Sequence, residues 1–355
     1  MKKKLSAICF IFFWLSVQSQ NLDSWQQVSS LGLSGNSRVR AISFSIDDKG
    51  YIGTGISDNL PRNDFGEYDP ATNQWLSKTN FGGSARWGAT GFSVAGKGYI
   101  GLGFDGANDR KDFWQYDPAT DSWTQKADFG GQARSNAVGF GINGKGYIGT
   151  GLVYLDANFP TDFWEYNPAT NSWTQKADFG GAGRSRAIGF CIGSKGYIGT
   201  GRIDSYNVTY KNDFYEYDPA TDSWARKADF EGGARSEAVG FSINTKGFIG
   251  TGEGSDGFIK KDFWEYDPVA DTWTRKTDFG GTARSSAVGL GISGKGYIGT
   301  GFDGKLQKDF WEYDPTNDKW VQKANAGGTI RKETVSFSIG GKGYVGTGDN
   351  WGRLL

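Results

Sequence analysis

Histidine is absent from all 355 residues, and cysteine (two), methionine (one) and proline (eight) are scarce. Without an imidazole, the chain cannot build a His-dependent catalytic triad or use histidine as a general acid or base. It also lacks the imidazole ligands that are usual in zinc and copper sites. We therefore expect no metal and no cofactor.

Long hydrophobic runs are also scarce, and the one at the start of the chain is too short to cross a membrane. A basic segment, Lys2 to Lys4, precedes the apolar run from Leu5 to Val17, and small residues stand at Val17 and Ser19. This order is typical of a secretory signal peptide, so we predict that residues 1–19 are removed after Ser19. A lipoprotein site at Cys9 is disfavoured because almost no hydrophobic stretch precedes it. The mature protein is expected to be secreted or periplasmic, without a membrane span.

The chain also has no formal net charge, because 39 basic residues balance 39 acidic residues. Loss of the signal segment removes three lysines and no acid, which leaves a formal charge of −3. The charges are spread evenly, so the sequence has no cluster of basic residues of the kind that binds nucleic acid. Cys191 is the only cysteine in the predicted mature chain, and we interpret it as a small buried strand residue.

Glycine is abundant, with 56 residues, and much of it belongs to an internal repeat. The phrase Lys-Gly-Tyr-Ile-Gly-Thr-Gly recurs with close variants, its aromatic residue standing at positions 51, 99, 147, 197, 248, 297 and 344. A second phrase, Asp-Phe-Trp-Glu-Tyr-Asp-Pro, recurs six times, with one substitution in four of the copies, and a tryptophan follows its tyrosine by seven residues each time. A fixed period near 50 residues is the mark of a repeat architecture.

One repeat predicts four β-strands, as residues 134–179 illustrate. Residues 137–142 alternate with period two, and a turn cluster at 143–146 leads into a second short strand. Asp162 to Tyr166 predicts the third strand, and Trp173 opens the fourth after an Asn-Pro turn. Aromatic faces alternate with Gly and Ala faces, so each sheet can seat its rings against the next sheet's backbone.

The outermost strands carry a lysine three residues after each of their tryptophans, at Lys78, Lys126, Lys176, Lys227, Lys276 and Lys323. Charge on an outer strand protects against edge-to-edge aggregation. We interpret these lysines as structural.

These phrases resemble the kelch-repeat family: the hydrophobic strand, the glycine doublet, the tyrosine and the tryptophan occur in family order over residues 21–348. The doublet reads Gly-Thr-Gly here. The resemblance implies an all-β, galactose-oxidase-like propeller of four-stranded antiparallel blades, with residues 20–355 as one domain. Galactose oxidase uses histidine ligands and a Cys–Tyr crosslink, so the lack of histidine excludes a copper oxidase of that kind.

The number of blades is open between seven and six. An arginine opens each first strand at Arg86, Arg134, Arg184, Arg235, Arg284 and Arg331, with Arg38 or Arg40 as the earliest copy, which gives seven openings. Asp23-Ser24-Trp25 resembles an orphan fourth strand. We therefore predict seven blades, the last built from both chain ends and incomplete because its third strand is missing. Six blades with both ends left over is the alternative.

Repeated charges admit two interpretations. The arginines that open the first strands and the aspartates that open the third strands (Asp64, Asp112, Asp162, Asp213, Asp262 and Asp309) should share one face of the ring. Repetition in every blade favours ion pairs that tie neighbouring strands. The functional alternative is a central pocket rimmed by Arg86, Arg134, Arg184, Arg235, Arg284 and Arg331, suited to carboxylates or acidic sugars. The hairpin lysines, such as Lys145 and Lys195, should lie on the opposite face.

Segments between second and third strands differ most between repeats, and the two longest are residues 152–161 and 202–212. Loops on a rigid scaffold can acquire specificity without loss of the fold. We predict a recognition surface there, with Tyr154, Phe159, Arg202, Tyr206 and Tyr210 as binding residues.

Two functions remain open. The favoured one is a monomeric, non-enzymatic binding or scaffold propeller for a protein or glycan at the cell exterior. The alternative is a histidine-independent sugar enzyme that resembles the kelch-type sialic acid epimerases and uses arginines and carboxylates in a central pocket. A deep pocket with a non-repeated Glu, such as Glu237 or Glu333, would favour the enzyme.

Overall fold

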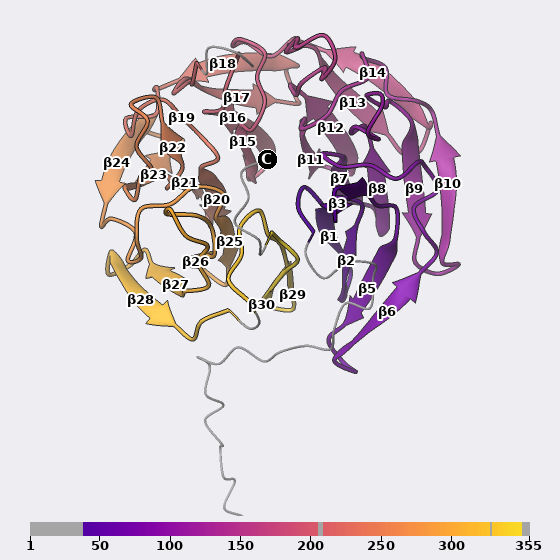
Figure 1. The fold of residues 1–355 in the computed structure, drawn as a ribbon. Coiled ribbons are helices and arrows are strands. Elements are labelled where there is room, and N and C mark those ends of the chain that lie inside the picture. The colour runs from indigo at the N-terminus through magenta and orange to yellow at the C-terminus, as the bar shows by residue number, and fades with distance from the viewer. Residues whose placement is uncertain (1–37, 205–208, 327–328, 350–355) are drawn as a thin grey trace, which may run out of the picture.

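The computed structural model describes residues 38–204, 209–326 and 329–349, and the strands of these residues form a ring of radial sheets around a central axis (Figure 1). The predicted signal segment, the orphan Asp23-Ser24-Trp25 and Tyr206 lie outside the described residues. No helix of the described part is long and apolar enough to cross a membrane.

Six sheets have four antiparallel strands each, and every sheet runs from the axis outward in chain order. The first three blades are β1 (Ile42–Ile46), β2 (Lys49–Gly53), β5 (Phe65–Asp69) and β6 (Gln74–Lys78); β7 (Thr90–Val94), β8 (Lys97–Gly101), β9 (Phe113–Asp117) and β10 (Ser122–Lys126); and β11 (Val138–Ile142), β12 (Lys145–Gly149), β13 (Phe163–Asn167) and β14 (Ser172–Lys176).

The next three blades are β15 (Ile188–Ile192), β16 (Lys195–Gly199), β17 (Phe214–Asp218) and β18 (Ser223–Lys227); β20 (Val239–Ile243), β21 (Lys246–Gly250), β23 (Phe263–Asp267) and β24 (Thr272–Lys276); and β25 (Val288–Ile292), β26 (Lys295–Gly299), β27 (Phe310–Asp314) and β28 (Lys319–Lys323). Short pairs of strands in the loops are β3 (Ile56–Ser57) with β4 (Leu60–Pro61), and β19 (Arg235–Ser236) with β22 (Glu253–Gly254).

The prediction of seven blades is wrong, because the described residues form six four-stranded blades. The seventh predicted first strand, which follows Arg331, belongs to a two-stranded hairpin of β29 (Val335–Ile339) and β30 (Lys342–Gly346). The hairpin occupies the ring position between the sixth and the first blade, where β29 contacts both β25 and β1 (Figure 1). The physical reason is that a full blade needs a third strand opened by Asp-Phe and a tryptophan strand after it, and six repeats of the described residues hold both.

Neighbouring blades pack by placing an aromatic ring over a glycine, as the alternation predicted. A methyl group added at Gly98 of β8 would lie 2.5 Å from the ring of Phe44 in β1, and one at Gly196 would lie 2.5 Å from the ring of Phe140. The hairpin takes part, because the ring of Phe337 lies over Gly50 of the first blade. Each blade therefore inserts a side chain into the next, and this packing needs glycine at the receiving position.

Hydrogen bonds join adjacent blades at the outer rim. The indole nitrogen Nε1 of Trp123 donates to the carbonyl oxygen of Thr79 at 3.0 Å, and Trp173 donates to Ala127 in the same way at 3.0 Å. The outer lysines are also paired, as Lys78 is with Glu67 at 3.6 Å and Lys176 with Asp222 at 3.5 Å. Together with the inserted rings, these bonds make the ring one continuous packed body.

Candidate functional site

The arginines that open the inner strands are buried and ion-paired. Arg86, Arg134, Arg184, Arg235 and Arg284 have no exposed side-chain surface, and each guanidinium binds an aspartate of the third strand in its own blade. Arg38, rather than Arg40, is the first copy, because it is equally buried and binds Asp64 at 2.7 Å. Each of these six also lies against further structure, as Arg86 donates to the carbonyl oxygen of Leu102 and Arg134 to that of Thr150. Their guanidinium groups are therefore fully buried and engaged within their own blades.

Arg331, the last member of the predicted rim, differs from the others. Its guanidinium donates to the carbonyl oxygens of Thr347 at 2.7 Å and Thr329 at 3.1 Å, and no carboxylate among the described residues binds it. Burial lowers the pKa of Arg331. The seventh repeat therefore has the arginine, but none of its described residues corresponds to the aspartate that pairs with the arginine in the other repeats.

The residue two positions after each of these seven arginines forms a ring around the axis, which we call the axial ring: Arg40, Gly88, Asn136, Arg186, Glu237, Ser286 and Glu333. All seven have a φ angle between +51° and +62°, in the left-handed region. Their backbones are linked, since the amide of Asn136 donates to Gly88 at 2.8 Å and that of Glu333 to Ser286 at 3.0 Å. The backbone of the axial ring is thus repeated, whereas its side chains are not.

Four of the axial-ring side chains are charged, and they form two ion pairs between neighbouring repeats. Arg40 pairs with Glu333 at 3.6 Å, and Arg186 pairs with Glu237, which also accepts a hydrogen bond from the hydroxyl of Ser286. The exposed side-chain fractions, 21% and 24% in the first pair and 30% and 18% in the second, leave part of each group accessible. These charges are not repeated from blade to blade, as a selective site requires.

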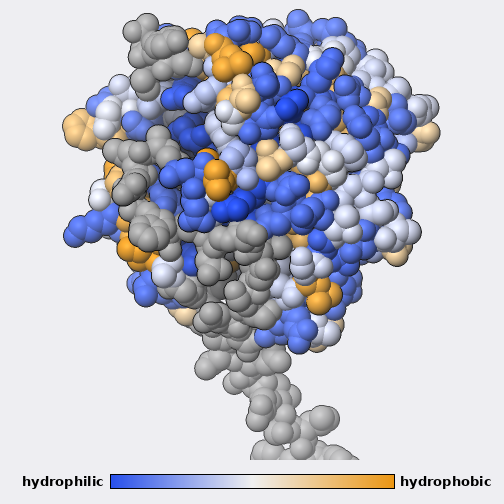
Figure 2. Space-filling view, turned by 45° about the vertical axis from the view of Figure 1, so that its right-hand side comes forward, coloured by the Kyte–Doolittle hydropathy of each residue, from blue (hydrophilic) through white to orange (hydrophobic). Residues whose placement is uncertain are grey.

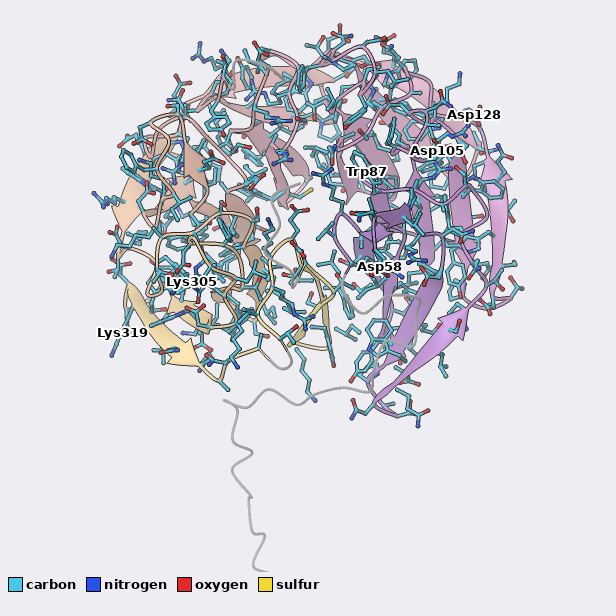
Figure 3. All side chains as sticks on the ribbon, in the orientation of Figure 1. Asp58, Trp87, Asp105, Asp128, Lys305 and Lys319 are labelled. Atoms are coloured by element: carbon cyan, nitrogen blue, oxygen red, sulfur yellow. The ribbon has the colours of Figure 1, made fainter. Side chains whose placement is uncertain are left out.

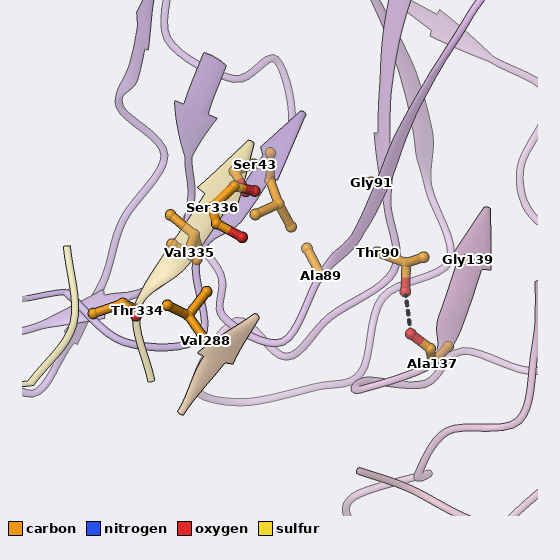
Figure 4. Close-up of a pocket in the computed structure, with 12 residues that line it drawn as sticks. Ser43, Ala89, Thr90, Gly91, Ala137, Gly139, Val288, Thr334, Val335 and Ser336 are labelled. Atoms are coloured by element: carbon orange, nitrogen blue, oxygen red, sulfur yellow. Dashed lines mark hydrogen bonds between the residues drawn. The ribbon is translucent and has the colours of Figure 1, made fainter. Parts of the chain in front are cut away.

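Below the axial ring lies a cavity of about 290 Å³ lined by small and β-branched residues at the inner strands (Figure 4). Its walls include Ala41, Ala89, Ala137 and Thr334, each of which directly follows an axial-ring residue. The hydroxyl of Thr90 donates to the carbonyl of Ala137 at 3.2 Å within this wall (Figure 4). The residues that line the cavity are therefore uncharged, and the charged side chains belong to the axial ring at its mouth.

Two of the predicted loop residues join this charged cluster. Arg202 and Tyr210 form a β-bridge with each other. Burial is the main cause that lowers the pKa of Arg186, and the charges of Arg40 and Arg202 lower it further. Burial and then the charge of Glu253 raise the pKa of Tyr210. Arg202 and Tyr210 therefore lie close enough to the axial-ring residue Arg186 to affect its charge equilibrium.

Tyr154 lies in a different part of the same face, in an aromatic cluster. Its ring contacts Trp87 with centroids 5.6 Å apart and Phe104 at 4.6 Å, and it stays 48% exposed. The guanidinium of Arg40 lies over the ring of Trp87, 4.7 Å from its centroid. Trp87 lies toward the inside of the ring, whereas Asp128 and Lys319 lie at its outer rim (Figure 3). Phe159 is half-buried, and its backbone packs against Gly183.

Sequence reasoning named Glu237 and Glu333 but missed Arg40, Arg186 and Trp87 as neighbours of the site. The signal was available in the repeat: the pattern Arg-x-x-Ala keeps its two ends in six of the seven copies, with Thr334 in place of alanine in the last, while the third position changes between Arg, Gly, Asn, Glu and Ser. The prediction relied on the loops between second and third strands, which vary in length. It therefore missed the axial-ring position, which varies only in its side chain.

Comparisons with known proteins support the propeller. No family model matches the sequence, and no curated protein matches it. Solved structures do match, among them one titled "Structure of YjhT", with a TM-score of 0.67 and 16% identity. The match covers 83% of this chain and 100% of that chain. At this identity the likeness establishes the β-propeller fold and leaves family and activity to other evidence.

Proposed function

We propose that this protein is a secreted, non-enzymatic binding propeller that recognises a glycan or protein chain on the face carrying the axial ring. The observation that carries the proposal is the axial ring itself. Its seven positions share one backbone conformation, yet they hold two arginines, two glutamates, an asparagine, a serine and a glycine. A rigid frame with variable polar side chains is what a recognition surface requires.

The chemistry of the mouth favours a glycan over a protein. Guanidinium, carboxylate, amide and hydroxyl groups at Arg186, Glu237, Asn136 and Ser286 can donate to and accept from sugar hydroxyls. The exposed ring of Tyr154, supported by Trp87, supplies an aromatic surface beside them. Exposed apolar residues are scattered among polar ones in Figure 2, without the continuous apolar patch that marks many protein interfaces.

A glycan array probed with the full mature chain tests the proposal, followed by titration of the best hit. Arg186→Gln and Glu237→Gln should each weaken binding about tenfold or more, because each removes a charged hydrogen-bonding group from the mouth. Tyr154→Ala should weaken it by a factor of about five to ten if the sugar reaches the aromatic cluster.

Lys145→Ala is the matched control, since Lys145 is a paired charge in a hairpin on the opposite face, bound to Glu165 at 2.6 Å. Normal binding by the mouth variants together with loss of binding in the control would place the site elsewhere and refute the proposal.

A second candidate, a sugar epimerase or mutarotase, is favoured by one observation: two carboxylates, Glu237 and Glu333, stand at the mouth within ion pairs to arginines. A carboxylate can exchange a proton with the anomeric hydroxyl or ring oxygen, and an arginine can hold an acidic sugar. Anomeric equilibration of glucose and glucuronate, followed by NMR, tests this candidate. It stands if the protein speeds equilibration and Glu237→Gln or Glu333→Gln abolishes the effect, and it falls if the rate equals that of buffer.

A further inference from the structure

The outer edge of strand β30 differs from every equivalent edge in the ring. In the six blades the second strand pairs with a third strand, as β26 does with β27 through Gly296–Tyr313, Ile298–Trp311 and Gly299–Phe310. Within the described residues, β30 pairs only with β29. Its Tyr344 is half-buried, whereas Tyr51 and Tyr99 at the same repeat position are 1% and 0% exposed.

Gly346 of β30 offers space for an aromatic ring. At the same repeat position, a methyl group added to Gly53, Gly101, Gly199 or Gly250 would lie 2.5–2.6 Å from the ring of the third-strand phenylalanine. Among the described residues, only Ile52 Cδ1 would lie near a methyl group added at Gly346, at 3.6 Å. The position thus retains its glycine, and no phenylalanine of the described chain packs against it.

Three polar groups beside β30 also lack the partner that their counterparts have. Arg284 binds Asp309 through both guanidinium nitrogens, the hydroxyl of Tyr297 donates to Glu312 at 2.9 Å, and Lys295 pairs with Asp314 at 2.7 Å. The equivalent residues are Arg331, Tyr344 and Lys342. Among the residues that the structure places, none of these three has an acidic partner.

We propose that the edge of β30 is an acceptor for an extended peptide with the pattern Asp-Phe-x-Glu-Tyr-Asp, which adds to the hairpin as a third antiparallel strand. The backbone ladder supplies affinity, as in other strand additions, and the side-chain positions supply specificity. The register follows from the sixth blade: phenylalanine opposite Gly346, glutamate opposite Tyr344, and tyrosine opposite Gly343. The first aspartate then meets Arg331 and the last meets Lys342, so charges match at both ends of the strand.

The experiment uses the full mature chain and a fluorescent peptide with the sequence of residues 308–315, Lys-Asp-Phe-Trp-Glu-Tyr-Asp-Pro. Fluorescence polarisation should show saturable one-to-one binding. Hydrogen exchange should show new protection at Lys342–Gly346 on adding peptide, because the edge amides of β30, which have no strand partner among the described residues, become bonded. Peptides with Phe→Ala or with the first Asp→Asn should bind about tenfold more weakly or worse, which tests the site without altering the protein.

Gly346→Val is the decisive protein variant, since it fills the space for the phenylalanine and leaves the strand direction unchanged. It should abolish peptide binding, and Arg331→Gln should weaken binding about tenfold and make it insensitive to the Asp→Asn peptide. Lys319→Gln, an exposed change on the outer strand of the sixth blade, is the control and should bind normally. Absence of peptide binding to the full chain, or equal binding by wild type and Gly346→Val, would overturn the proposal.

Discussion

Replacing Asp112 by asparagine tests whether the repeated Arg–Asp pairs stabilise the blades by tying the first strand of each blade to its third strand. Arg86 is fully buried, and its two terminal nitrogens donate to the carboxylate oxygens of Asp112 at 2.6 and 2.8 Å. The indole Nε1 of Trp114 donates to the same carboxylate at 2.8 Å. The asparagine side chain keeps the shape but leaves the arginine charge buried without an opposite charge.

The expected cost follows from that burial. Breaking one partner of a buried ion pair typically destabilises a protein by about 3–5 kcal/mol, which is a large part of a typical domain's stability of about 5–15 kcal/mol. We therefore expect Asp112→Asn to lower the urea midpoint strongly, measured by tryptophan fluorescence and circular dichroism. Asp128→Asn, an exposed aspartate on the outer rim, is the control and should change stability by less than about 0.5 kcal/mol.

The difference in stability between the wild type and Asp112→Asn should depend on pH in a definite direction. Burial by itself would raise the pKa of Asp112, but the hydrogen bonds and charge of Arg86 outweigh burial and hold that pKa below its usual range. A lowered native pKa contributes stability above the unfolded pKa, and the contribution is lost as pH falls through the native pKa. The gap between wild type and Asp112→Asn should persist at neutral pH and shrink only in acid. Equal midpoints for Asp112→Asn and Asp128→Asn at pH 7 would refute the role assigned to the pair.

Three further predictions concern packing and reactivity. Gly101→Ala should destabilise by about 1–3 kcal/mol, because its methyl group would meet the ring of Phe113 at 2.5 Å, whereas Gly346→Ala at the same repeat position should be neutral or slightly stabilising in thermal unfolding. Trp173→Phe should cost about 0.5–1.5 kcal/mol in urea denaturation, because the carbonyl of Ala127 loses its donor; a cost near zero would mean that water replaces the indole. Burial raises the pKa of the Cys191 thiol to about 12, so a disulfide reagent at pH 8 should label the native protein far more slowly than the urea-unfolded chain. Labelling of native protein at the unfolded rate would show that the thiol is accessible.

The strands of each blade could be predicted from the sequence because the same strand pattern recurs in six repeats. For residues 134–179 the predicted strands agree with β11 to β14 to within about two residues at each end. The seven-blade count failed because it followed the arginine that opens each inner strand. A complete blade requires the two outer strands as well, and among the described residues only the two strands β29 and β30 follow Arg331.

The candidate site was harder to predict, for two physical reasons. Local propensity favours glycine or asparagine in the left-handed conformation, and Gly88 and Asn136 fit that rule, but Arg186 and Glu237 do not reveal their backbone in the sequence. The loops are irregular, so nothing in the sequence indicates that Tyr154 packs on Trp87 of the preceding repeat. Arg202 and Tyr210 could be singled out as unusual, yet only the structure relates them to Arg186.

If the axial ring binds a ligand, as proposed, this architecture has a simple route to new ligands. Each repeat contributes one residue to the mouth from a position outside its strands, so a change in a single codon alters one sector of the surface while the blade stays intact. Chains descended from a common ancestor could therefore diverge in what they bind through changes at these few codons. Duplication or loss of a repeat would also alter the order of charges around the mouth. In such a lineage, the residues of the axial ring would change with the ligand, whereas the phrases that contain phenylalanine, tryptophan and glycine would be retained because the fold requires them.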